Sequence, residues 1–328
     1  MKRYIVDILD GMAKGLFSSL IAGLIITQIG KLVNMEQVLM IGKFAQYLMG
    51  PAIGVGIALK RGARMHTVIA AAIVGALGAG TFDFETNALK VGEAVGALIS
   101  VLLAVEVGKL VEGRTTFDLL LVPILVSSVG GVVALFIAPP ISSFMNSVGV
   151  LINNITLMQP VLMGILLGLI VGALLTLPIS SAALCVSIGI DGLAAGAALA
   201  GCCAQMIGFA VISYRENRLS GLLLQALGTS MIQIGNIVKN FWVWVPTLVA
   251  SALGGLLATT VFKLPSTSLG AGMGTAGLVG PIATLELVGA EKILEMILLY
   301  ILIPAFLSFF VYVFLSKLGC IKQGDLKL

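Results

Sequence analysis

Long apolar segments separated by short charged segments give the sequence its main pattern. The apolar segments lie near residues 15–33, 37–59, 67–82, 92–111, 117–138, 160–178, 192–213, 241–262 and 292–316. A helix needs about 20 apolar residues to cross a bilayer, and most of these segments have that length. A transmembrane β-barrel would need alternating apolar and polar residues, whereas these runs are unbroken. The pattern therefore predicts an all-α integral membrane protein.

The composition supports this prediction. The chain has 328 residues, of which 59% are hydrophobic and 10% charged, and its mean hydropathy is +1.13. Soluble domains have about 45–50% apolar and about 25% charged residues, so a soluble fold would have too few charges for its surface. At about 20 residues per span plus a short connection, the chain has room for about ten transmembrane passes. The net charge of +4 is too small to predict nucleic-acid binding.

Basic residues in the connecting segments predict the orientation. Cytoplasmic loops of membrane proteins have an excess of lysine and arginine, which here places both termini in the cytoplasm and the acidic segment 81–86 outside. Arg215 and Arg218 also fit the cytoplasm, provided that residues 174–190 form a broken or re-entrant piece. The start of the chain is basic but has no small-residue cleavage site, so we expect a retained cytoplasmic end. The basic residues used are Lys2, Arg3, Lys14, Lys60, Arg61, Arg64, Lys109, Arg114, Lys317, Lys322 and Lys327.

Three stretches do not fit ordinary spans. Residues 141–156 are amphipathic and follow Pro139-Pro140, which predicts a helix lying in the membrane interface. Residues 219–240 are apolar but interrupted by amides and hydroxyls, and residues 264–290 are rich in glycine with two prolines. Irregular backbone survives at membrane depth only where it is buried in protein or lines a wet cavity. We therefore expect two re-entrant hairpins that form a substrate site; the alternative is two long extramembrane loops.

Other residue patterns predict packing rather than chemistry. Gly164, Gly168 and Gly172 recur every four residues, so they share a helix face and predict a close helix contact. The four cysteines have no metal-ligand spacing, and the single histidine, His66, stands in a basic loop. Since the sequence also has no phosphate-binding loop and no hydrolase or kinase pattern, we expect no catalytic residue, metal or cofactor, and no enzyme that acts alone.

From Phe117 to about residue 290 the sequence resembles the membrane (IIC) subunit of the bacterial sugar phosphotransferase system, above all the fructose type. A second shared stretch begins at GTSMIQIGNIVKNFW and continues through Pro246 and an Ala-Leu-Gly-Gly helix. The resemblance covers about half of the chain. The marks in its first part are Pro123, Gly130, Pro139-Pro140, the amphipathic helix, Gly164, Gly168, Pro178 and Ala182-Ala183.

The departures from the fructose type concern its polar groups. The family's aspartate position is Leu174, its glycine pair is Thr176-Leu177, and its asparagine-lysine pair is Ser180-Ser181. The sugar-binding glutamate position holds Met231, and the His-Gly-Gly of the second hairpin falls at Ser268-Leu269-Gly270. This combination of a kept scaffold and replaced chemistry is similar to a divergent, PfoR-like branch of the family.

The resemblance implies a homodimer in the bacterial cytoplasmic membrane, with hairpins that move the sugar as an elevator. Phosphorylation would need separate IIA and IIB proteins. We expect N-terminal helices over 1–116 that contribute to the scaffold or dimer region. The IIC-like region then covers 117–316 and a cytoplasmic tail 317–328. Two functions follow: a permease for a sugar or another polar small molecule, or a membrane sensor or regulator that kept the scaffold and transports little.

The candidate ligand groups stand in the two predicted hairpins. They are Thr229, Ser230, Gln233, Asn236, Lys239 and Asn240 in the first, and Ser266, Thr267 and Ser268 at the start of the second. A lysine at membrane depth costs about 2.5–3.5 kcal/mol, so Lys239 would need a partner or an acidic or phosphorylated ligand. The alternative is that Lys239 extends to the interface. For the three residues of the second hairpin, helix capping competes with ligand binding.

The remaining polar and aromatic residues have structural interpretations beside functional ones. Phe241, Trp242 and Trp244 favour an interfacial aromatic belt over sugar stacking. Asp191 favours a helix cap over a ligand group, and Glu286 a surface position over a proton site. Glu106 and Lys109 are three residues apart, so we expect them to pair on one helix face.

Overall fold

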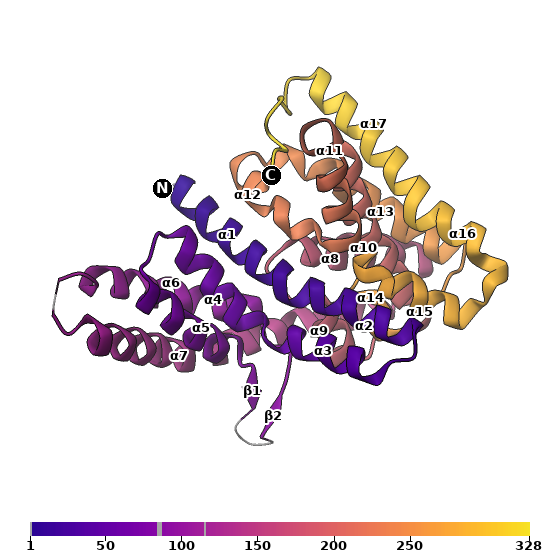
Figure 1. Cartoon of the computed structure of the whole chain (residues 1–328). Helices are drawn as coiled ribbons and strands as arrows, with labels where there is room; N and C mark the ends of the chain where they lie inside the picture. The colour runs from indigo at the N-terminus through magenta and orange to yellow at the C-terminus, as the bar shows by residue number, and fades with distance from the viewer. Residues whose placement is uncertain (1, 84–86, 115) are drawn as a thin grey trace. The chain divides into compact units, whose positions relative to one another are not determined.

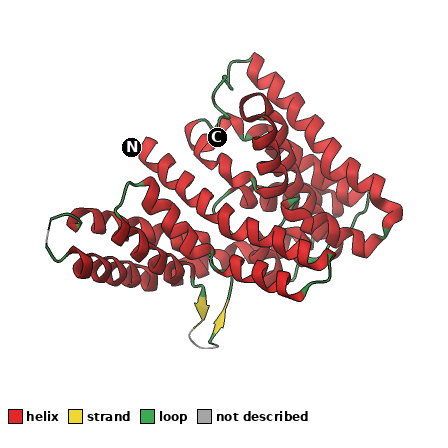
Figure 2. Cartoon of the chain, viewed as in Figure 1, coloured by secondary structure: helices red, strands yellow, loops and turns green. Residues whose placement is uncertain are grey.

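The computed structural model describes residues 2–83, 87–114 and 116–328. Most of this is helix, and the described residues contain one short antiparallel pair of strands, β1 (Phe82–Asp83) and β2 (Ala88–Leu89) (Figure 2). Residues 84–86 of the acidic segment lie outside the described residues. The predicted all-α class is confirmed.

The chain divides into two compact units, Met1–Phe144 and Met145–Leu328. The boundary falls inside α7 (Asp118–Thr156), which is continuous through both prolines at 139 and 140. Residues 141–156 are therefore helical as expected, but they extend α7 and do not begin a separate helix after the prolines. Our division at residue 116 and the interfacial position of 141–156 stay predictions.

The first unit is a set of helices in close contact through small residues. It contains α1 (Lys2–Leu16), a π-helical turn (Phe17–Ile21), α2 (Ala22–Leu32), α3 (Glu36–Tyr47), α4 (Met49–Lys60), α5 (Met65–Ala79), α6 (Ala94–Val111) and the first part of α7. α4 packs against α1 and α5, and α5 packs against α6. A Cβ added at Gly54 would come within 2.0 Å of the Ala71 carbonyl oxygen, so glycine is what lets α4 and α5 approach.

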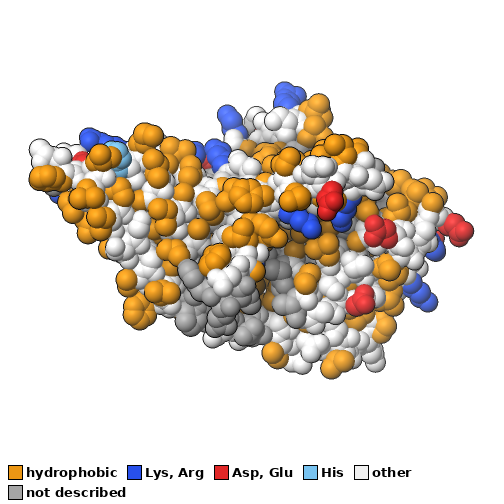
Figure 3. Space-filling model, turned by 60° about the horizontal axis from the view of Figure 1, so that its bottom comes forward, with side chains coloured by type: hydrophobic (Ala, Val, Ile, Leu, Met, Phe, Trp, Pro, Cys, Tyr) orange, Lys and Arg blue, Asp and Glu red, His pale blue; other side chains and the backbone are white. Residues whose placement is uncertain are grey.

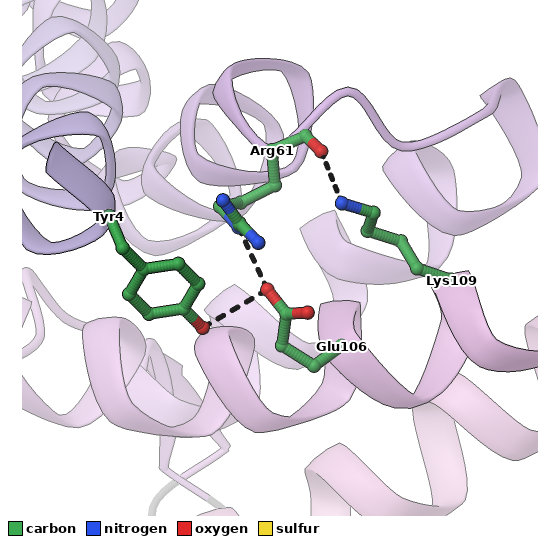
Figure 4. A network of polar contacts seen from close by, with 4 residues as sticks. All are labelled: Tyr4, Arg61, Glu106 and Lys109. Carbon is green, nitrogen blue, oxygen red and sulfur yellow. Dashed lines mark hydrogen bonds and ion pairs between the residues drawn. The ribbon is translucent and has the colours of Figure 1, made fainter. Parts of the chain in front are cut away.

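Charged groups in the first unit meet where helices end (Figure 4). Arg61, just after α4, donates from Nε to Glu106 Oε1 at 2.8 Å, and Tyr4 Oη donates to the same oxygen at 3.1 Å. Lys109 Nζ donates to the backbone oxygen of Arg61 at 2.6 Å. Glu106 and Lys109 thus bind Arg61 instead of each other, because the loop after α4 brings a closer partner to each. The Glu106 carboxylate raises the pKa of Arg61 above its ordinary value.

The second unit is built around one buried helix, α10 (Gly192–Ile212) (Figure 1). Of the window of α10 that could span a membrane, 89% is buried, and the helix packs against α8, α13 and α17. The helices of this unit are the last part of α7, α8 (Pro160–Thr176), α9 (Ser181–Ile188), α10, α11 (Tyr214–Leu223), α12 (Ile234–Lys239), α13 (Val245–Thr260), α14 (Ser268–Ala271), α15 (Val279–Val288), α16 (Ile293–Ile297) and α17 (Ile303–Lys317).

The predicted glycine contact on α8 is confirmed. A Cβ at Gly164 would lie 2.6 Å from the Gly255 oxygen, and one at Gly168 would lie 2.5 Å from the Ser251 oxygen, both on α13. A Cβ at Gly172 would lie 2.8 Å from the Gly201 oxygen on α10. The four-residue repeat therefore brings α8 into backbone contact with two helices at once.

Six helical stretches among the described residues are long and apolar enough to cross a membrane, and the pair α3 and α4, bent by 51°, would make a seventh. Three shorter apolar helices are Met65–Ala79, Pro160–Thr176 and Ala276–Val288. Large apolar side chains such as Phe136 and Leu157 are exposed, and hydrophobic side chains are spread over the face seen in Figure 3. The length and composition of these helices support a multi-pass membrane protein, whereas the count of ten passes stays a prediction.

The segments expected to be irregular are broken helices. Residues 174–190 contain the end of α8, a break and the short α9. The first broken segment, 219–240, contains the end of α11, a π-helical turn (Leu224–Gly228), a 3₁₀ turn (Ser230–Gln233) and α12. The second broken segment, 264–290, contains α14, a 3₁₀ turn (Ala276–Leu278) and α15. Their position in a membrane stays a prediction.

Candidate functional site

Three helix breaks of the second unit come together beside α10. α8 ends at Thr176, before Leu177 and Pro178. The first broken segment changes direction at Thr229, which has extended backbone and accepts a hydrogen bond from the Met231 N–H at 3.1 Å. The second changes direction at Gly274, whose φ of +57° favours glycine. Each break therefore has a local cause in proline, a hydroxyl cap or glycine.

Hydrogen bonds join these breaks to one another. Thr176 Oγ1 and Ser230 Oγ are 2.8 Å apart, which connects the end of α8 to the first broken segment. Ser181 Oγ donates to the Gly272 oxygen at 2.7 Å, which connects α9 to the second broken segment. Thr275 Oγ1 donates to the Ala226 oxygen at 2.5 Å, which connects the two broken segments directly.

Gln205, in the middle of α10, is the centre of the polar contacts at this point. Its Oε1 accepts from Thr176 Oγ1 at 3.1 Å, from Trp244 Nε1 at 2.9 Å and from Thr247 Oγ1 at 2.9 Å. Its Nε2 donates to Ser251 Oγ at 2.9 Å. Together with Ser230, these residues form the Gln205 cluster. Its members are Thr176, Gln205, Ser230, Trp244, Thr247 and Ser251, all buried.

The Gln205 cluster consists of uncharged hydrogen-bonding groups. Hydroxyls can donate and accept, and the amide offers both functions in fixed directions. Such groups are matched to the hydroxyls of a sugar, and they are unsuited to acid-base or nucleophilic chemistry without an activating partner. Within the described residues, no group of three histidine, cysteine, aspartate or glutamate side chains could hold a metal ion.

The other predicted ligand groups of the first broken segment make their hydrogen bonds outside the Gln205 cluster. Asn236 Nδ2 donates to Gln233 Oε1 at 2.7 Å, and both side chains are buried. Gln233, Asn236 and Asn240 also donate to backbone oxygens of residues 318–328. Lys239 is exposed and donates to Asn236 Oδ1 at 3.3 Å. Of the six predicted groups, Ser230 alone belongs to the Gln205 cluster; Thr229 caps the turn beside it.

The three residues of the second broken segment form a separate group. The Ser266 N–H donates to the Gly192 oxygen at 3.0 Å, and Ser266 Oγ accepts from Thr284 Oγ1 at 3.2 Å. Thr267 caps α14, which begins at Ser268, by accepting from the Gly270 N–H at 3.2 Å. Gly192 and Gln205 stand thirteen positions apart on α10, about 20 Å along a helix axis. The structure therefore does not bring Ser266 to Ser230.

The structural interpretations of Asp191 and Glu286 are supported by the structure, whereas that of Trp244 is not. Asp191 caps α10, accepting from the Gly192 N–H at 2.7 Å, and Glu286 is exposed. Trp244 is 9% exposed and points its N–H at Gln205, so it is not part of an aromatic belt. Phe241 and Trp242, at 58% and 49%, are exposed as a belt requires.

Sequence reasoning missed four members of the cluster: Thr176, Gln205, Thr247 and Ser251. One signal was present, because Gln205 is the one amide in the apolar run 192–213. A polar side chain in the middle of a membrane helix faces the protein interior and is a candidate functional group. Thr247 and Ser251 carry no such signal, since serine and threonine are common where membrane helices pack.

Comparison with curated proteins and with solved structures finds no match. The family model that is described as phosphotransferase system, EIIC, matches residues 6–328. This match extends well beyond the 117–290 region of the sequence resemblance and includes the N-terminal helices. The chain therefore belongs to the EIIC family of the phosphotransferase system.

Proposed function

We propose that this protein is a permease for a sugar or a sugar derivative, and that its ligand binds where the three helix breaks meet at the Gln205 cluster. Membership of the EIIC family supports a role in membrane sugar transport. The observation on which the proposal rests is the pair of contacts from Thr176 to Ser230 and Gln205, which ties the end of α8 and the first broken segment to the central helix. Broken helices around a buried polar centre are typical of transporter binding sites.

A ligand would enter this centre by exchange of hydrogen bonds. The contacts between the breaks join neutral groups, and one such bond contributes about 0.5–1.5 kcal/mol net. A sugar hydroxyl that inserts between Thr275 Oγ1 and the Ala226 oxygen can accept from the first and donate to the second, so that neither buried group is left unpaired. In the proposed elevator mechanism, the two broken segments part at the Thr275 to Ala226 contact, admit the sugar and move with it.

We also propose that both termini lie in the cytoplasm and that separate IIA and IIB proteins phosphorylate the sugar there. The contacts of the first unit support the proposed position of the N-terminus. Arg61, just after α4, and Lys109, in the last turn of α6, were both assigned to the cytoplasm by their charge. Lys109 donates to the Arg61 backbone oxygen, and Arg61 also lies over the Tyr4 ring at 4.1 Å. All three positions are therefore on one side, as the positive-inside rule requires. We also propose that the protein forms a homodimer, that its scaffold is of the fructose type, and that it belongs to a PfoR-like branch of the family.

The second candidate function is a membrane sensor or regulator. One observation favours it: the polar residues 233, 236 and 240 already bind backbone oxygens of residues 318–328, so they are not available to a transported ligand in this state. The family's glutamate and histidine positions hold Met231 and Ser268. A regulator would keep the scaffold and its ligand site but would move little substrate.

A ligand screen with matched variants tests the proposal. Purified protein is heated with neutral sugars, sugar acids, sugar phosphates and nucleosides, and a ligand at a hundred times its dissociation constant adds about 2.7 kcal/mol of stability. Ser230→Ala and Gln205→Leu should remove the stabilisation by a sugar. Thr259→Ala is the control, because Thr259 is buried on α13 and binds the Pro160 oxygen, outside the cluster.

The outcomes separate the two functions. A sugar that stabilises the wild type and the control, but neither cluster variant, supports the site. A sugar that stabilises all of them equally removes the Gln205 cluster from the ligand site. Uptake into vesicles with the same sugar then distinguishes a permease from a sensor, because a sensor binds without accumulation.

A further inference from the structure

Residues 318–328, called the strap here, fold back along the first broken segment (Figure 1). On the side of α11, Glu216 Oε1 accepts from the Gly324 N–H at 2.9 Å. Asn217 makes two bonds to the strap, donating to the Leu326 oxygen at 2.8 Å and accepting from the Leu328 N–H at 2.9 Å. The sequence predicted a cytoplasmic tail over 317–328, and the backbone of this segment is held by side chains of the second unit.

The strap also binds α12 and the residues beside it. Asn236 Nδ2 donates to the Lys327 oxygen at 3.0 Å, and Asn240 Nδ2 donates to the Cys320 oxygen at 2.8 Å and to Asp325 at 2.9 Å. The Ile321 and Leu326 side chains are buried in an apolar cluster with Phe209 and Val243. The strap is thus hydrogen-bonded to the start of α11, just before the first broken segment, and packed and hydrogen-bonded to the α12 end of that segment.

A cavity of about 590 Å³ lies between the strap, α11 and α17. This volume is in the range of small-molecule sites, about 300–1,000 Å³. The cavity is distinct from the Gln205 cluster, since none of the six cluster residues lines it. Its lining residues are Arg215, Glu216, Tyr312, Ser316, Ile321, Gln323, Gly324 and Lys327.

Two cations stand at this cavity without a carboxylate partner. In the part of the chain that the structure describes, neither Arg215 nor Lys327 forms an ion pair, and both side chains are exposed. An arginine fork and a lysine ammonium together match the oxygens of a phosphate group. The positive charge of the lining therefore favours an anion.

Two lining residues have a buried oxygen that lacks a partner. Glu216 Oε2 and Ser316 Oγ are shielded from solvent and make no hydrogen bond among the described residues. A buried polar atom without a partner is unfavourable, and a donor that reaches it stabilises the protein. The carboxylate oxygen can only accept, so the missing group must donate, as a hydroxyl does.

We propose that this cavity binds a small molecule with a phosphate group next to hydroxyl groups, and that its binding holds the strap against the first broken segment. Arg215 and Lys327 bind the phosphate, and Glu216 and Ser316 accept or exchange hydrogen bonds with the hydroxyls. Because the strap forms one wall of the cavity and also binds Asn236 and Asn240, a filled cavity resists release of the strap. The proposal is independent of where the transported sugar binds.

The test uses the full chain in a neutral detergent and follows the alkylation of Cys320 by a maleimide. Cys320 is in the strap and partly exposed, while Cys185, Cys202 and Cys203 are buried. The probes are glucose 6-phosphate, glucose, inorganic phosphate and phosphatidylglycerol. We expect glucose 6-phosphate to slow the alkylation, with glucose ineffective and inorganic phosphate weaker. Protection by phosphatidylglycerol in place of glucose 6-phosphate supports the site and identifies a lipid headgroup as the source of the phosphate.

Matched variants make the result specific to the cavity. The double variant Arg215→Ala and Lys327→Ala should bind the probe about tenfold more weakly, which corresponds to about 1.4 kcal/mol of binding free energy. Lys322→Ala is the control, because Lys322 is also a strap lysine but does not line the cavity. Ser316→Ala removes an oxygen that has no partner, so it should fold as well as the wild type and still bind the probe more weakly.

Two results would overturn the proposal: no phosphate-containing probe slows Cys320 alkylation, or the double variant responds as the Lys322→Ala control does. Gln205→Leu keeps all the cavity residues, so it should retain the response to glucose 6-phosphate. If no sugar binds the Gln205 cluster but glucose 6-phosphate still slows the alkylation, the proposed function fails and this inference stands. If a sugar binds the cluster but no phosphate-containing probe slows the alkylation, this inference fails and the proposed function stands.

Discussion

The indole N–H of Trp244 donates to Gln205 Oε1 at 2.9 Å, although the two residues are 39 positions apart in the sequence. Two hydroxyls, of Thr176 and Thr247, donate to the same oxygen. One amide in the middle of α10 thus fixes the end of α8, the start of α13 and, through Thr176, the turn at Ser230. Two of the three helix breaks are thus held in place by a side chain that is not itself at a break.

Replacing Gln205 by leucine should therefore destabilise the protein. The change keeps a similar volume but leaves the Trp244 N–H and two hydroxyls facing an apolar group, and each buried donor without a partner costs about 1–3 kcal/mol. Because the hydroxyls can turn to other acceptors, we expect a total loss of about 2–4 kcal/mol. Trp244→Phe removes a single donor and should cost less than Gln205→Leu. Thermal unfolding in detergent measures both, and equal stability of wild type and Gln205→Leu would contradict the role of the cluster.

Two adjacent glycines of α13 should respond in opposite ways to alanine. A Cβ at Gly255 would lie 2.1 Å from the Gly164 oxygen, so Gly255→Ala must push α8 and α13 apart. Overpacking of this kind costs about 1–3 kcal/mol. At Gly254 the nearest atom would be the Ala200 oxygen at 3.5 Å, an ordinary contact, so Gly254→Ala should be neutral or slightly stabilising. Thermal unfolding of the two variants side by side checks the prediction, which fails if they lose the same stability.

The sequence was sufficient for the helical class and for the contact face of α8. Both follow from patterns that are local to one segment: apolar runs of span length, and glycines four apart at 164, 168 and 172. It was misleading at Pro139-Pro140, where we expected a new helix. Proline usually interrupts a helix, but membrane helices tolerate it where neighbouring groups satisfy the freed carbonyls, and α7 continues through both prolines.

The candidate site could be predicted only in part, because its contacts join distant parts of the chain. Ser230 was predicted from its place at the tip of an apolar, polar-interrupted segment. Its partner Thr176 is 54 positions away, and no local pattern connects the two. The strap was missed for a related reason: its lysines indicate a solvated tail, whereas the buried side chains of Ile321 and Leu326 and the bonds from Asn236 and Asn240 become visible only in three dimensions.

The contact between Glu106 and Arg61 should make a small, salt-sensitive contribution to the stability of the first unit. Their side chains are 36% and 17% exposed, and pairs near solvent contribute about 0.2–1 kcal/mol. Glu106→Gln keeps an acceptor for Tyr4 but removes the charge that faces Arg61, so we expect a loss of up to about 1 kcal/mol that shrinks as salt is raised. Thermal unfolding at low and high ionic strength measures it. A loss that does not change with salt would show that the contact acts through packing.

Release of the strap should be measurable through Cys320. Asn240 holds the strap by two bonds, to the Cys320 oxygen and to Asp325, so Asn240→Ala removes both. We expect Cys320 to react with a maleimide several-fold faster in this variant, since the loss of two bonds of about 1 kcal/mol each raises the population of the released strap. Asn154→Ala is the matched control, because Asn154 is an exposed asparagine on α7. The same rate in wild type and Asn240→Ala, with the protein folded, would mean that the two Asn240 bonds do not hold the strap, and that the bonds from Gln233 and Asn236 or the burial of Ile321 and Leu326 hold it instead.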